Sequence, residues 1–452
     1  MNIKRFATKR IWILLVAILF TLNVSSVKAQ EVITLQEAIT QALKNKADAQ
    51  KAKLEIDRAS ARVNEAKASG LPQINVNPQV TYNPLIQQSV IDFNGQQTVI
   101  KMGQPWTSNV AASLQQTIFD QRVFSGLKAA KSSREFYMIN AELTNEQIIE
   151  NVALAYYNVF VQEENLKTAN ESYINIEKMR NVISSLVDNG LAKPIDLDRT
   201  NVQLNNVAAT QQTLINAVEL TKNALKFYMG IPMETNIVLY DEKIEPNPQL
   251  ILGEMDVNNR LEMKVLNKRK ELLELNKKVT KASLYPSAYL QGIYGWYGTG
   301  EKFPWTNGKN NSVNWSDFAN ISLNINIPIF AGGANRARIQ QAKLDILSTD
   351  LDIKDTGLAL EMDYKNAVSN LENALINLEN MEENVALAEK VQNNTQSNYQ
   401  YGLANLTDVL DSDNALTQAK QNYANALLNY KSSEIKLIKA KGELNQLTET
   451  TN

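Results

Sequence analysis

The feature that most limits the fold of this chain is a helical pattern of unusual length. One run extends from Gln121 to Val187, and a second extends from Ala334 to Gln400. At a rise of 1.5 Å per residue, each run would span about 100 Å. Helices of globular domains are mostly about three or four turns long. A chain with two such rods is therefore predicted to be elongated rather than compact.

The chain follows one plan twice. Three features recur at nearly the same spacing: a proline after a helical segment, a phenylalanine at the end of an alternating segment, and a glycine turn. The pairs are Pro72 and Pro286 (214 residues apart), Phe119 and Phe330 (211), and Gly190 and Gly402 (212). We interpret these offsets as an internal duplication, with a period far longer than a solenoid unit. The first repeat covers residues 30–229 and the second covers 259–452, with an inter-repeat equatorial element at 230–258 that is rich in proline and turn residues.

Each repeat has the same predicted order of elements. A first helix, at 35–69 or 259–283, ends before a proline, because residues that precede proline disfavour the helical conformation. Two strands joined by a polar loop follow, then the long helix, the glycine turn and a last helix that ends near residue 228 or 447. The four strand candidates are about 72–82, 106–119, 286–297 and 315–329.

The strand candidates alternate between apolar and polar residues. In the last one, five apolar residues point one way: Ile321, Leu323, Ile325, Ile327 and Ile329. This pattern fits a half-buried sheet on a soluble core, or a membrane barrel that is apolar toward lipid and polar toward a lumen. The barrel is favoured because the helices offer no globular core. Aromatic residues also gather at the strand ends, as in an interfacial girdle: Trp106, Trp296, Tyr297, Trp305 and Trp315.

Four strands cannot close a barrel, and lipid does not tolerate open sheet edges. The chain is therefore expected to form an oligomer. Eight strands from a dimer would leave a bore filled with side chains, whereas twelve strands from a trimer would leave an aqueous channel. The polar inner faces favour the homotrimer. The loops at about 83–105 and 298–314 are expected outside the cell, because the strand–helix junctions must face the periplasm.

Residues 1–29 have the form of a secretory signal peptide. Basic residues precede the apolar run Ile11–Phe20, and Val27–Ala29 has the small-x-small form of a cleavage site. A retained membrane anchor is the alternative, but the run is short for a span, and no cysteine follows it to carry a lipid anchor. Removing residues 1–29 takes away five basic residues and no acid, so the formal net charge falls from −2 to −7. Such a chain is a poor binder of nucleic acid.

Composition argues against an enzyme. The chain has no histidine and no cysteine, which removes the commonest zinc sites and the histidine-based catalytic triads. The glycine pair in Ala331–Asn335 lacks the lysine and the spacing of a phosphate-binding loop. Composition does not exclude catalysis by aspartate or glutamate. The acidic residues, however, are spread along the predicted long helices and are not gathered in a pocket. No catalytic activity, cofactor or metal is therefore expected.

The last helix has the pattern of a coiled coil. Large residues recur every seven positions, and small residues lie three positions further on; these are Val409, Leu416, Tyr423, Tyr430 and Leu437, followed by Ser412, Ala419, Ala426, Ser433 and Ala440. Large residues at one seam position and small residues at the other favour close, interdigitating packing. Helices of this kind can pack side by side into a hollow cylinder.

With these features the chain resembles the TolC family of trimeric outer-membrane efflux proteins. The most specific residues are Gly402–Asp411 (GLANLTDVLD), which resemble the family's second periplasmic turn, and their first-repeat counterpart Gly190–Asp196 (GLAKPID). The resemblance covers essentially all of the chain after the signal peptide. It implies an α+β membrane protein: long coiled-coil helical hairpins form a periplasmic α-barrel, and four β-strands per chain contribute to a trimeric 12-stranded outer-membrane β-barrel.

The resemblance also implies a function without chemistry. The chain would be the outer-membrane exit duct of a tripartite efflux or type I secretion system. It would conduct substrates passively from an inner-membrane pump and a periplasmic adaptor (membrane fusion) protein to the outside.

Two acids after the second glycine turn, Asp408 and Asp411, allow two interpretations. As helix caps, with Thr407 at the N-cap, each acid would contribute about 0.3–1 kcal/mol near the positive end of the helix dipole. As a constriction, they lie three residues apart beside the seam of the last helix, so both can face a common lumen. A trimer would then carry a ring of carboxylates that attracts cations and repels anions. The resemblance implies that Asp408 and Asp411 line the tunnel's entrance constriction, and both interpretations can hold together.

The resemblance also suggests how the tunnel closes. In the best-known family pattern, an arginine two residues after the turn glycine locks the closed state to an acid of the first repeat, but this chain has Ala404 there. Asp196 and Tyr399 match other members of that network, so a contact between them is expected. The remaining candidates are Lys193 as a replacement cation, Leu403 and Leu406 as hydrophobic contacts, and Gly190 and Gly402 as the periplasmic turn tips.

Two other protein classes combine some of these features. A trimeric adhesive surface protein also joins a barrel to coiled coils, but its strands would gather at the C-terminus, and here they are divided between two repeats. A periplasmic adaptor would have one helical hairpin and a soluble β-rich domain without strands that alternate toward lipid. Detergent dependence of the purified protein would separate a duct from an adaptor.

Overall fold

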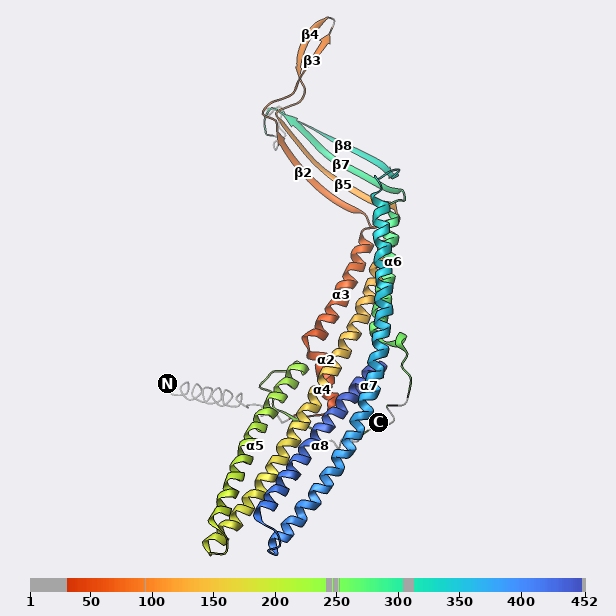
Figure 1. The fold of residues 1–452 in the computed structure, drawn as a ribbon. Helices are drawn as coiled ribbons and strands as arrows, with labels where there is room; N and C mark the ends of the chain where they lie inside the picture. Colours follow the sequence, from red (N-terminus) through yellow and green to blue (C-terminus); the bar gives the residue numbers. More distant parts are fainter. Residues whose placement is uncertain are drawn as a thin grey trace, which may run out of the picture.

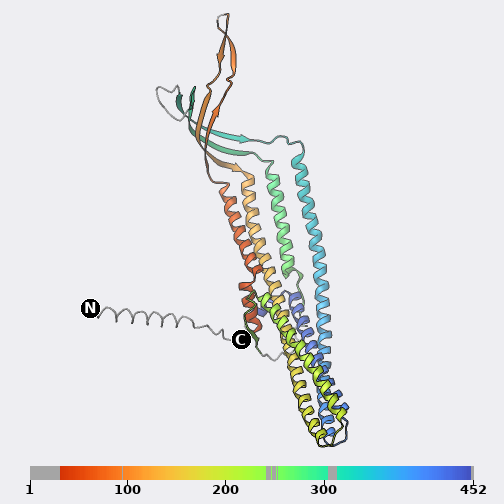
Figure 2. The ribbon, with the colours of Figure 1, turned by 90° about the vertical axis from the view of Figure 1, so that its left-hand side faces the viewer.

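The computed structural model describes residues 31–93, 95–240, 246, 251, 253–303 and 313–448, so the predicted signal peptide lies outside the described residues. The described chain is elongated, with a curved four-stranded sheet at one end and both glycine turns at the other (Figures 1 and 2). Its elements are β1 (Glu31–Ile33), α2 (Leu35–Asn45), α3 (Ala47–Ala68), β2 (Gln73–Tyr82), β3 (Gln88–Phe93), β4 (Gln96–Lys101), β5 (Trp106–Asp120), α4 (Gln121–Asp188), α5 (Pro194–Met229), β6 (Ile237–Leu239), the short 3-10 helix η2 (Val257–Asn259), α6 (Leu261–Ala282), β7 (Ser287–Gly300), β8 (Val313–Asn326), α7 (Ala334–Gln400), α8 (Leu406–Lys441) and the 3-10 helix η3 (Leu444–Thr448).

The two rods are confirmed. Helix α4 has 68 residues and α7 has 67, and each pairs with the shorter helix that follows it, α5 or α8. None of the helices in the described ranges combines the length and the apolar character needed to cross a membrane. Both rods extend from the sheet to the turns, and α6 and α8 each contact both of them (Figure 1).

The first helix, predicted at 35–69, is in fact two helices that break at Lys46. Lys46 has extended backbone angles (φ −62°, ψ 129°) and ends α2 before α3 begins. The cause lies far along the chain, where Gly230 ends α5 in the left-handed conformation (φ 69°). A Cβ added to Gly230 would lie 2.9 Å from the backbone of Asn45 and Lys46. The close approach of these two backbones fixes the position of the break.

The last helix also ends earlier than predicted. Gly442 adopts the left-handed conformation (φ 77°) and ends α8 at Lys441, and residues 444–448 form η3 instead of continuing the helix to Leu447. A glycine in this conformation is the usual device for stopping a helix.

The four predicted strands form one antiparallel sheet in the order β2-β5-β7-β8. The register produces rows of like residues. One row contains Gln73, Gln115, Gln291 and Ser322, and the adjacent row, which faces the opposite side, contains Ile74, Leu114, Gly292 and Ile321. The alternation seen in single strands is therefore coherent across all four. Strand β8 ends at Asn326, short of the predicted residue 329, before Pro328, which has no N–H to donate to a ladder.

The prediction of only four strands was wrong. Strands β3 and β4 form an antiparallel hairpin within the segment predicted as a polar loop at 83–105. Strands β1 and β6 pair in parallel near the middle of the molecule, where the Tyr156 hydroxyl donates to the Ile33 carbonyl at 3.3 Å. In the second predicted loop, at 298–314, the strands β7 and β8 take up 298–300 and 313–314, and Trp305 lies outside the described residues.

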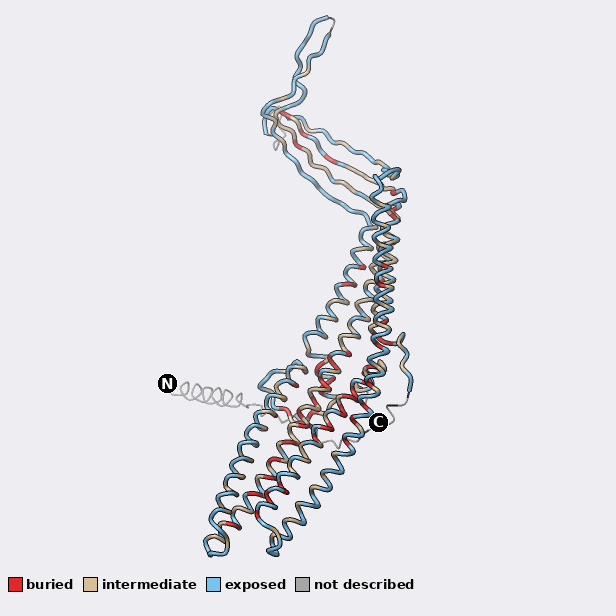
Figure 3. Tube along the Cα trace, viewed as in Figure 1, coloured by how far each residue is buried: buried red, intermediate tan, exposed pale blue. Residues whose placement is uncertain are grey.

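Buried residues gather at mid-height and along the helical hairpins, whereas in the sheet the edge strands β2 and β8 are mostly exposed and the central strands β5 and β7 are mostly intermediate or buried (Figure 3). One cluster joins α2, α4, α5, α8, β1, β6 and η3 at the level of the inter-repeat element. A second lies along the α7–α8 seam and includes Tyr430, Leu437, Ala426 and Ala440. These are four of the large and small residues of the predicted coiled-coil pattern.

Candidate functional site

The two glycine turns have the same backbone geometry. Gly190 (φ 71°) and Gly402 (φ 73°) both lie in the left-handed region. In each turn the glycine N–H and the N–H of the following leucine donate back to the last turn of the long helix: Leu191 to the Leu186 carbonyl at 2.7 Å, and Leu403 to the Asn398 carbonyl at 2.8 Å. Both turns lie at the same end of the molecule (Figure 1). The predicted tip residues therefore occupy one surface.

Helix α8 begins with a cap that differs from the prediction. Its N-cap is Asn405 and not Thr407. The Asp408 carboxylate accepts the Asn405 backbone N–H at 3.0 Å, so Asp408 does cap the helix, from its third position. The Thr407 hydroxyl instead accepts a 3.3 Å hydrogen bond from the Arg199 guanidinium of α5.

The acids at the start of α8 lie in two environments. Asp408 and Asp411 are exposed. Asp413 is only 4% exposed, and its carboxylate accepts a 2.7 Å hydrogen bond from the Ser172 hydroxyl of α4. Burial raises the pKa of Asp413 above its ordinary value, and the Ser172 hydrogen bond and the Lys420 charge partly oppose that effect. Only the first two acids are thus available to solvent at the tip.

A small apolar cluster lies just above the turns. Leu406 and Leu410 of α8 pack with Ile183 of α4, and Tyr399 lies at the edge of this cluster. Leu403, by contrast, is 77% exposed at the tip. Of the two leucines predicted as gate contacts, Leu406 therefore packs inside the protomer and Leu403 faces outward.

The negative charge of Asp196 at the start of α5 acts on Tyr399 near the end of α7. The pKa of the Tyr399 hydroxyl is raised, first by burial and second by the negative charge of Asp196. Among the described residues no hydrogen bond joins the two side chains, and no ion pair includes Lys193, which is exposed at the N-cap of α5.

Two hydrogen bonds that the sequence did not predict tie α5 to α8. One is the Arg199–Thr407 bond, and the other runs from the Gln203 amide to the Asn414 amide oxygen at 2.6 Å. These partners are 208 and 211 residues apart in sequence, close to the spacing of the two turns. The spacing of the two turns was the sequence feature from which these bonds could have been expected. It indicates that equivalent stretches of the two repeats lie side by side.

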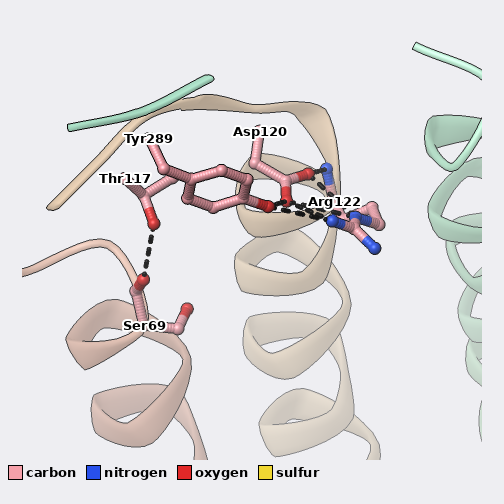
Figure 4. Close-up of polar contacts among 5 residues, drawn as sticks. All are labelled: Ser69, Thr117, Asp120, Arg122 and Tyr289. Atoms are coloured by element: carbon pink, nitrogen blue, oxygen red, sulfur yellow. Dashed lines mark hydrogen bonds and ion pairs between the residues drawn. The ribbon is translucent and has the colours of Figure 1, made fainter. Parts of the chain in front are cut away.

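A second polar cluster fastens the sheet to the helices (Figure 4). Asp120 ends β5 and caps α4 by accepting the Arg122 backbone N–H at 2.8 Å. Its carboxylate also forms a 2.7 Å ion pair with Arg122 and accepts the Tyr289 hydroxyl of β7 at 2.8 Å. Beside it, the Thr117 hydroxyl donates to the Ser69 carbonyl at the end of α3 (3.4 Å). The junction thus joins elements of both halves of the chain, and the end of the predicted strand was the one cue to it in the sequence.

Comparison with known proteins identifies the family to which this chain is similar. A family model described as outer membrane efflux protein matches residues 38–231 and 255–443, which together make up most of the chain. The chain belongs to the outer membrane efflux protein family.

Relatives within this family are distant in sequence. Outer membrane protein TolC of Salmonella enteritidis is 21% identical over 422 residues, covering 91% of this chain and 82% of the relative. The probable outer membrane lipoprotein SilC of Salmonella typhimurium is 22% identical over 420 residues, covering 89% and 84%. The toluene efflux pump outer membrane protein TtgF of Pseudomonas putida is 24% identical over 304 residues, covering 65% and 60%.

Solved structures share the fold. The outer membrane protein VceC of Vibrio cholerae aligns with a TM-score of 0.69 at 18% identity, over 90% of this chain and 96% of VceC. The open state of the MtrE outer membrane channel of Neisseria gonorrhoeae aligns with a TM-score of 0.68 at 19% identity, over 92% and 91%. The chain is therefore an outer-membrane efflux protein with a long helical extension, and its family is one of channels and not of enzymes.

Proposed function

We propose that three copies of this chain close a twelve-stranded outer-membrane barrel that continues into a periplasmic helical tunnel. The proposal rests on the sheet. Its edge strands, β2 and β8, each have one side that pairs with no other strand of the described chain. One of its faces carries the exposed side chains Ile321, Leu323 and Ile325. An apolar face suits lipid, but open edges in lipid leave unsatisfied backbone groups. Pairing β2 of one protomer with β8 of the next removes both edges.

The opposite face of the sheet supports an aqueous lumen. Its glutamine and serine row, from Gln73 to Ser322, would line the inside of the closed barrel. Twelve strands leave a channel, whereas eight are filled by side chains. The barrel would then act as a passive exit duct for substrates delivered from the periplasmic side.

The tip supports docking of a periplasmic adaptor and, through it, an inner-membrane pump. Three large side chains are exposed there: Leu191 (76%), Leu403 (77%) and Tyr401 (80%). Exposed apolar side chains on two adjacent turns fit the helical end of a partner protein, because burying them on assembly is favourable. Leu403 would thus serve the interface with the partner as well as the closed state.

Asp408 and Asp411 are proposed as the constriction of the tunnel. Both are exposed on the first two turns of α8, next to the tip. Three copies would bring six carboxylates together at the narrow end, which favours cations over anions. Capping by Asp408 does not compete with this role, since one carboxylate oxygen accepts the Asn405 N–H and the other has no hydrogen-bond partner among the described residues.

The gate is proposed to be held by contacts between the two helical hairpins of each protomer. Arg199–Thr407 and Gln203–Asn414 join α5 to α8 directly, and the charge of Asp196 also acts on Tyr399 of α7. Lys193 and the glycine tips would adjust the turn geometry and not form the lock.

The element order also supports the proposed duplication. The series α3, β2, β5, α4, α5 has the same sequence of helix, two strands, long helix and last helix as α6, β7, β8, α7, α8. We retain the repeat boundaries 30–229 and 259–452, with 230–258 between them.

The experiment that tests the proposal is native mass measurement of the full chain in detergent, followed by single-channel recording in planar bilayers. A trimer that conducts ions is expected. A stable, water-soluble monomer that forms no channel would refute the proposed architecture.

A further inference from the structure

The β3–β4 hairpin projects beyond the four-stranded sheet and is covered by no other described element (Figures 1 and 2). It nevertheless carries large apolar side chains: Val90 and Val99 are each 60% exposed, Ile91 is 42% exposed and Ile100 is 44% exposed. An isolated two-stranded hairpin is at best marginally stable in water. A hairpin of this composition therefore requires a partner that covers it.

The hairpin is apolar on both faces. In its register Val90 is opposite Val99, so these two side chains share one face. Ile91 pairs with Thr98 and Ser89 pairs with Ile100, so both isoleucines lie on the other face. Side chains alternate strictly between the faces of a strand. A ribbon that docks onto one flat surface needs only one apolar face, and this ribbon has two.

The hydrocarbon of the membrane is not the partner that covers the apolar side chains of the hairpin. At the hairpin end of the sheet, Tyr82 packs on Trp106 with ring centroids 4.6 Å apart, and Trp106 packs on Phe303 at 5.0 Å. Aromatic clusters of this kind mark the interface between membrane and water. The hairpin lies beyond this cluster, and its apolar residues are therefore on the aqueous side.

The hairpin continues the edge that faces the neighbouring protomer. The Asn83 N–H donates to the Pro105 carbonyl at 2.7 Å, and the Met102 N–H donates to the Gln87 carbonyl at 2.8 Å. These bonds extend the β2–β5 ladder into the β3–β4 ladder, so β3 prolongs the free edge of β2. In the trimer of the proposed function, on which this inference rests, that edge lies at the boundary between protomers.

We propose that the three hairpins of the trimer pack against one another outside the membrane. Each would place its Val90/Val99 face against the Ile91/Ile100 face of the next. In a closed ring each subunit presents two different surfaces to its two neighbours, which explains why both faces are apolar. The occupant of each face is thus a second copy of this chain.

The absence of cysteine from the chain makes the contact measurable. The variant Ile91→Cys/Val99→Cys has one thiol on each face. These thiols point in opposite directions within a protomer, and a link within one chain would not change its mass on a denaturing gel, so only links between protomers give dimers and trimers. Treatment of intact cells with a short bismaleimide is expected to link the variant into covalent dimers and trimers on denaturing gels. Each single variant, Ile91→Cys or Val99→Cys, is expected to give at least tenfold less product.

A second measurement uses accessibility. A membrane-impermeant maleimide should label Gln96→Cys, next to the hairpin turn, several-fold faster than Val99→Cys. Equal labelling rates, or a double variant that stays unlinked although native mass measurement finds the trimer, would overturn the hairpin contact and leave the proposed function intact. Equal linking of the single and double variants would refute the two-face arrangement. Absence of the trimer itself would refute the proposed function as well.

Discussion

The Ser172 hydroxyl donates a 2.7 Å hydrogen bond to the Asp413 carboxylate across the seam between α4 and α8, where both residues are buried. This seam joins the two helical hairpins of the protomer. In contrast to the apolar α7–α8 seam, it carries a buried carboxyl group. Its packing should therefore depend on pH.

Asp413 should make the protein more stable in acid. Its folded-state pKa is raised above its ordinary value of 3.8, so the folded state binds the proton more tightly than the unfolded state. Its favourable contribution is complete below pH 3.8 and is lost as pH rises through the folded pKa. We expect Asp413→Asn to raise the melting temperature at neutral pH and to leave it nearly unchanged near pH 4. The exposed Asp411→Asn variant is the matched control, and an equal shift in both variants would exclude burial as the cause.

The paired substitution Asp408→Asn/Asp411→Asn should change conduction without changing the fold. Asparagine caps helices about as well as aspartate, so the melting temperature should stay within about 2 °C. Loss of the proposed carboxylate ring should lower the selectivity for cations and the block by multivalent cations in planar bilayers. Unaltered selectivity and block would mean that the two acids are only helix caps.

Arg199→Ala should loosen the closed state. The substitution removes the hydrogen bond to Thr407, and a surface bond of this kind contributes about 0.5–1.5 kcal/mol. We expect a higher open probability in bilayers, with cation selectivity retained, and the same direction of change for Asp196→Asn. Thr407→Val should reproduce the effect of Arg199→Ala, and the double variant should add little to either. Full additivity would show that the two residues act separately.

Tyr289→Phe should weaken the junction between sheet and helices. The phenol hydroxyl donates to Asp120 at 2.8 Å and accepts from Arg122 at 3.1 Å. Its loss is expected to cost about 1–2 kcal/mol in trimer stability, since the Asp120 carboxylate remains buried with one donor fewer. Thermal unfolding in detergent measures this change. The exposed Tyr401→Phe variant, at the opposite end, should leave the unfolding midpoint unchanged.

Gly230→Ala should destabilise the protein far more than Gly402→Ala. Both glycines are left-handed (φ 69° and 73°), which costs an alanine roughly 1 kcal/mol. Only at Gly230 would the new Cβ also meet backbone atoms at 2.9 Å, whereas nothing lies within 4 Å at Gly402. The difference between the two unfolding midpoints isolates the steric contribution. Equal midpoints would show that the α2–α3 break adjusts freely.

The structural features that were predicted correctly are those that depend on residues close together in the sequence. The two rods, the four strands of the sheet and the glycine turns follow from periodicity and from backbone preferences within a few residues. The break at Lys46 could not be predicted in this way, because it depends on Gly230, which is distant in the chain. The β3–β4 hairpin had a local cue, Asn94-Gly95, a pair that favours tight hairpin turns. Its short apolar pairs, however, are separated by polar residues, which suggested a loop.

The candidate site likewise contains features that the local sequence indicates and features that depend on the folded arrangement. The turns at Gly190 and Gly402 and the exposed positions of Asp408 and Asp411 agree with their sequence pattern. Arg199–Thr407 and Gln203–Asn414 depend on the register between α5 and α8, which only the folded arrangement sets. Asn405 takes the N-cap in place of Thr407 because α8 begins two residues earlier than the prediction required.

The strand order β2-β5-β7-β8 also constrains how the protein is made. Residues of β5 pair with residues of β7 that lie between 167 and 194 positions later in the chain. Helical hairpins such as α4–α5 join segments close in sequence and can form while synthesis continues, but contacts of high sequence separation form late because the entropy of closing a long loop opposes them. The sheet must therefore be the last part of the protomer to assemble. Until then its apolar strands are at risk of aggregation, so export should require a chaperone that holds them unpaired in the periplasm.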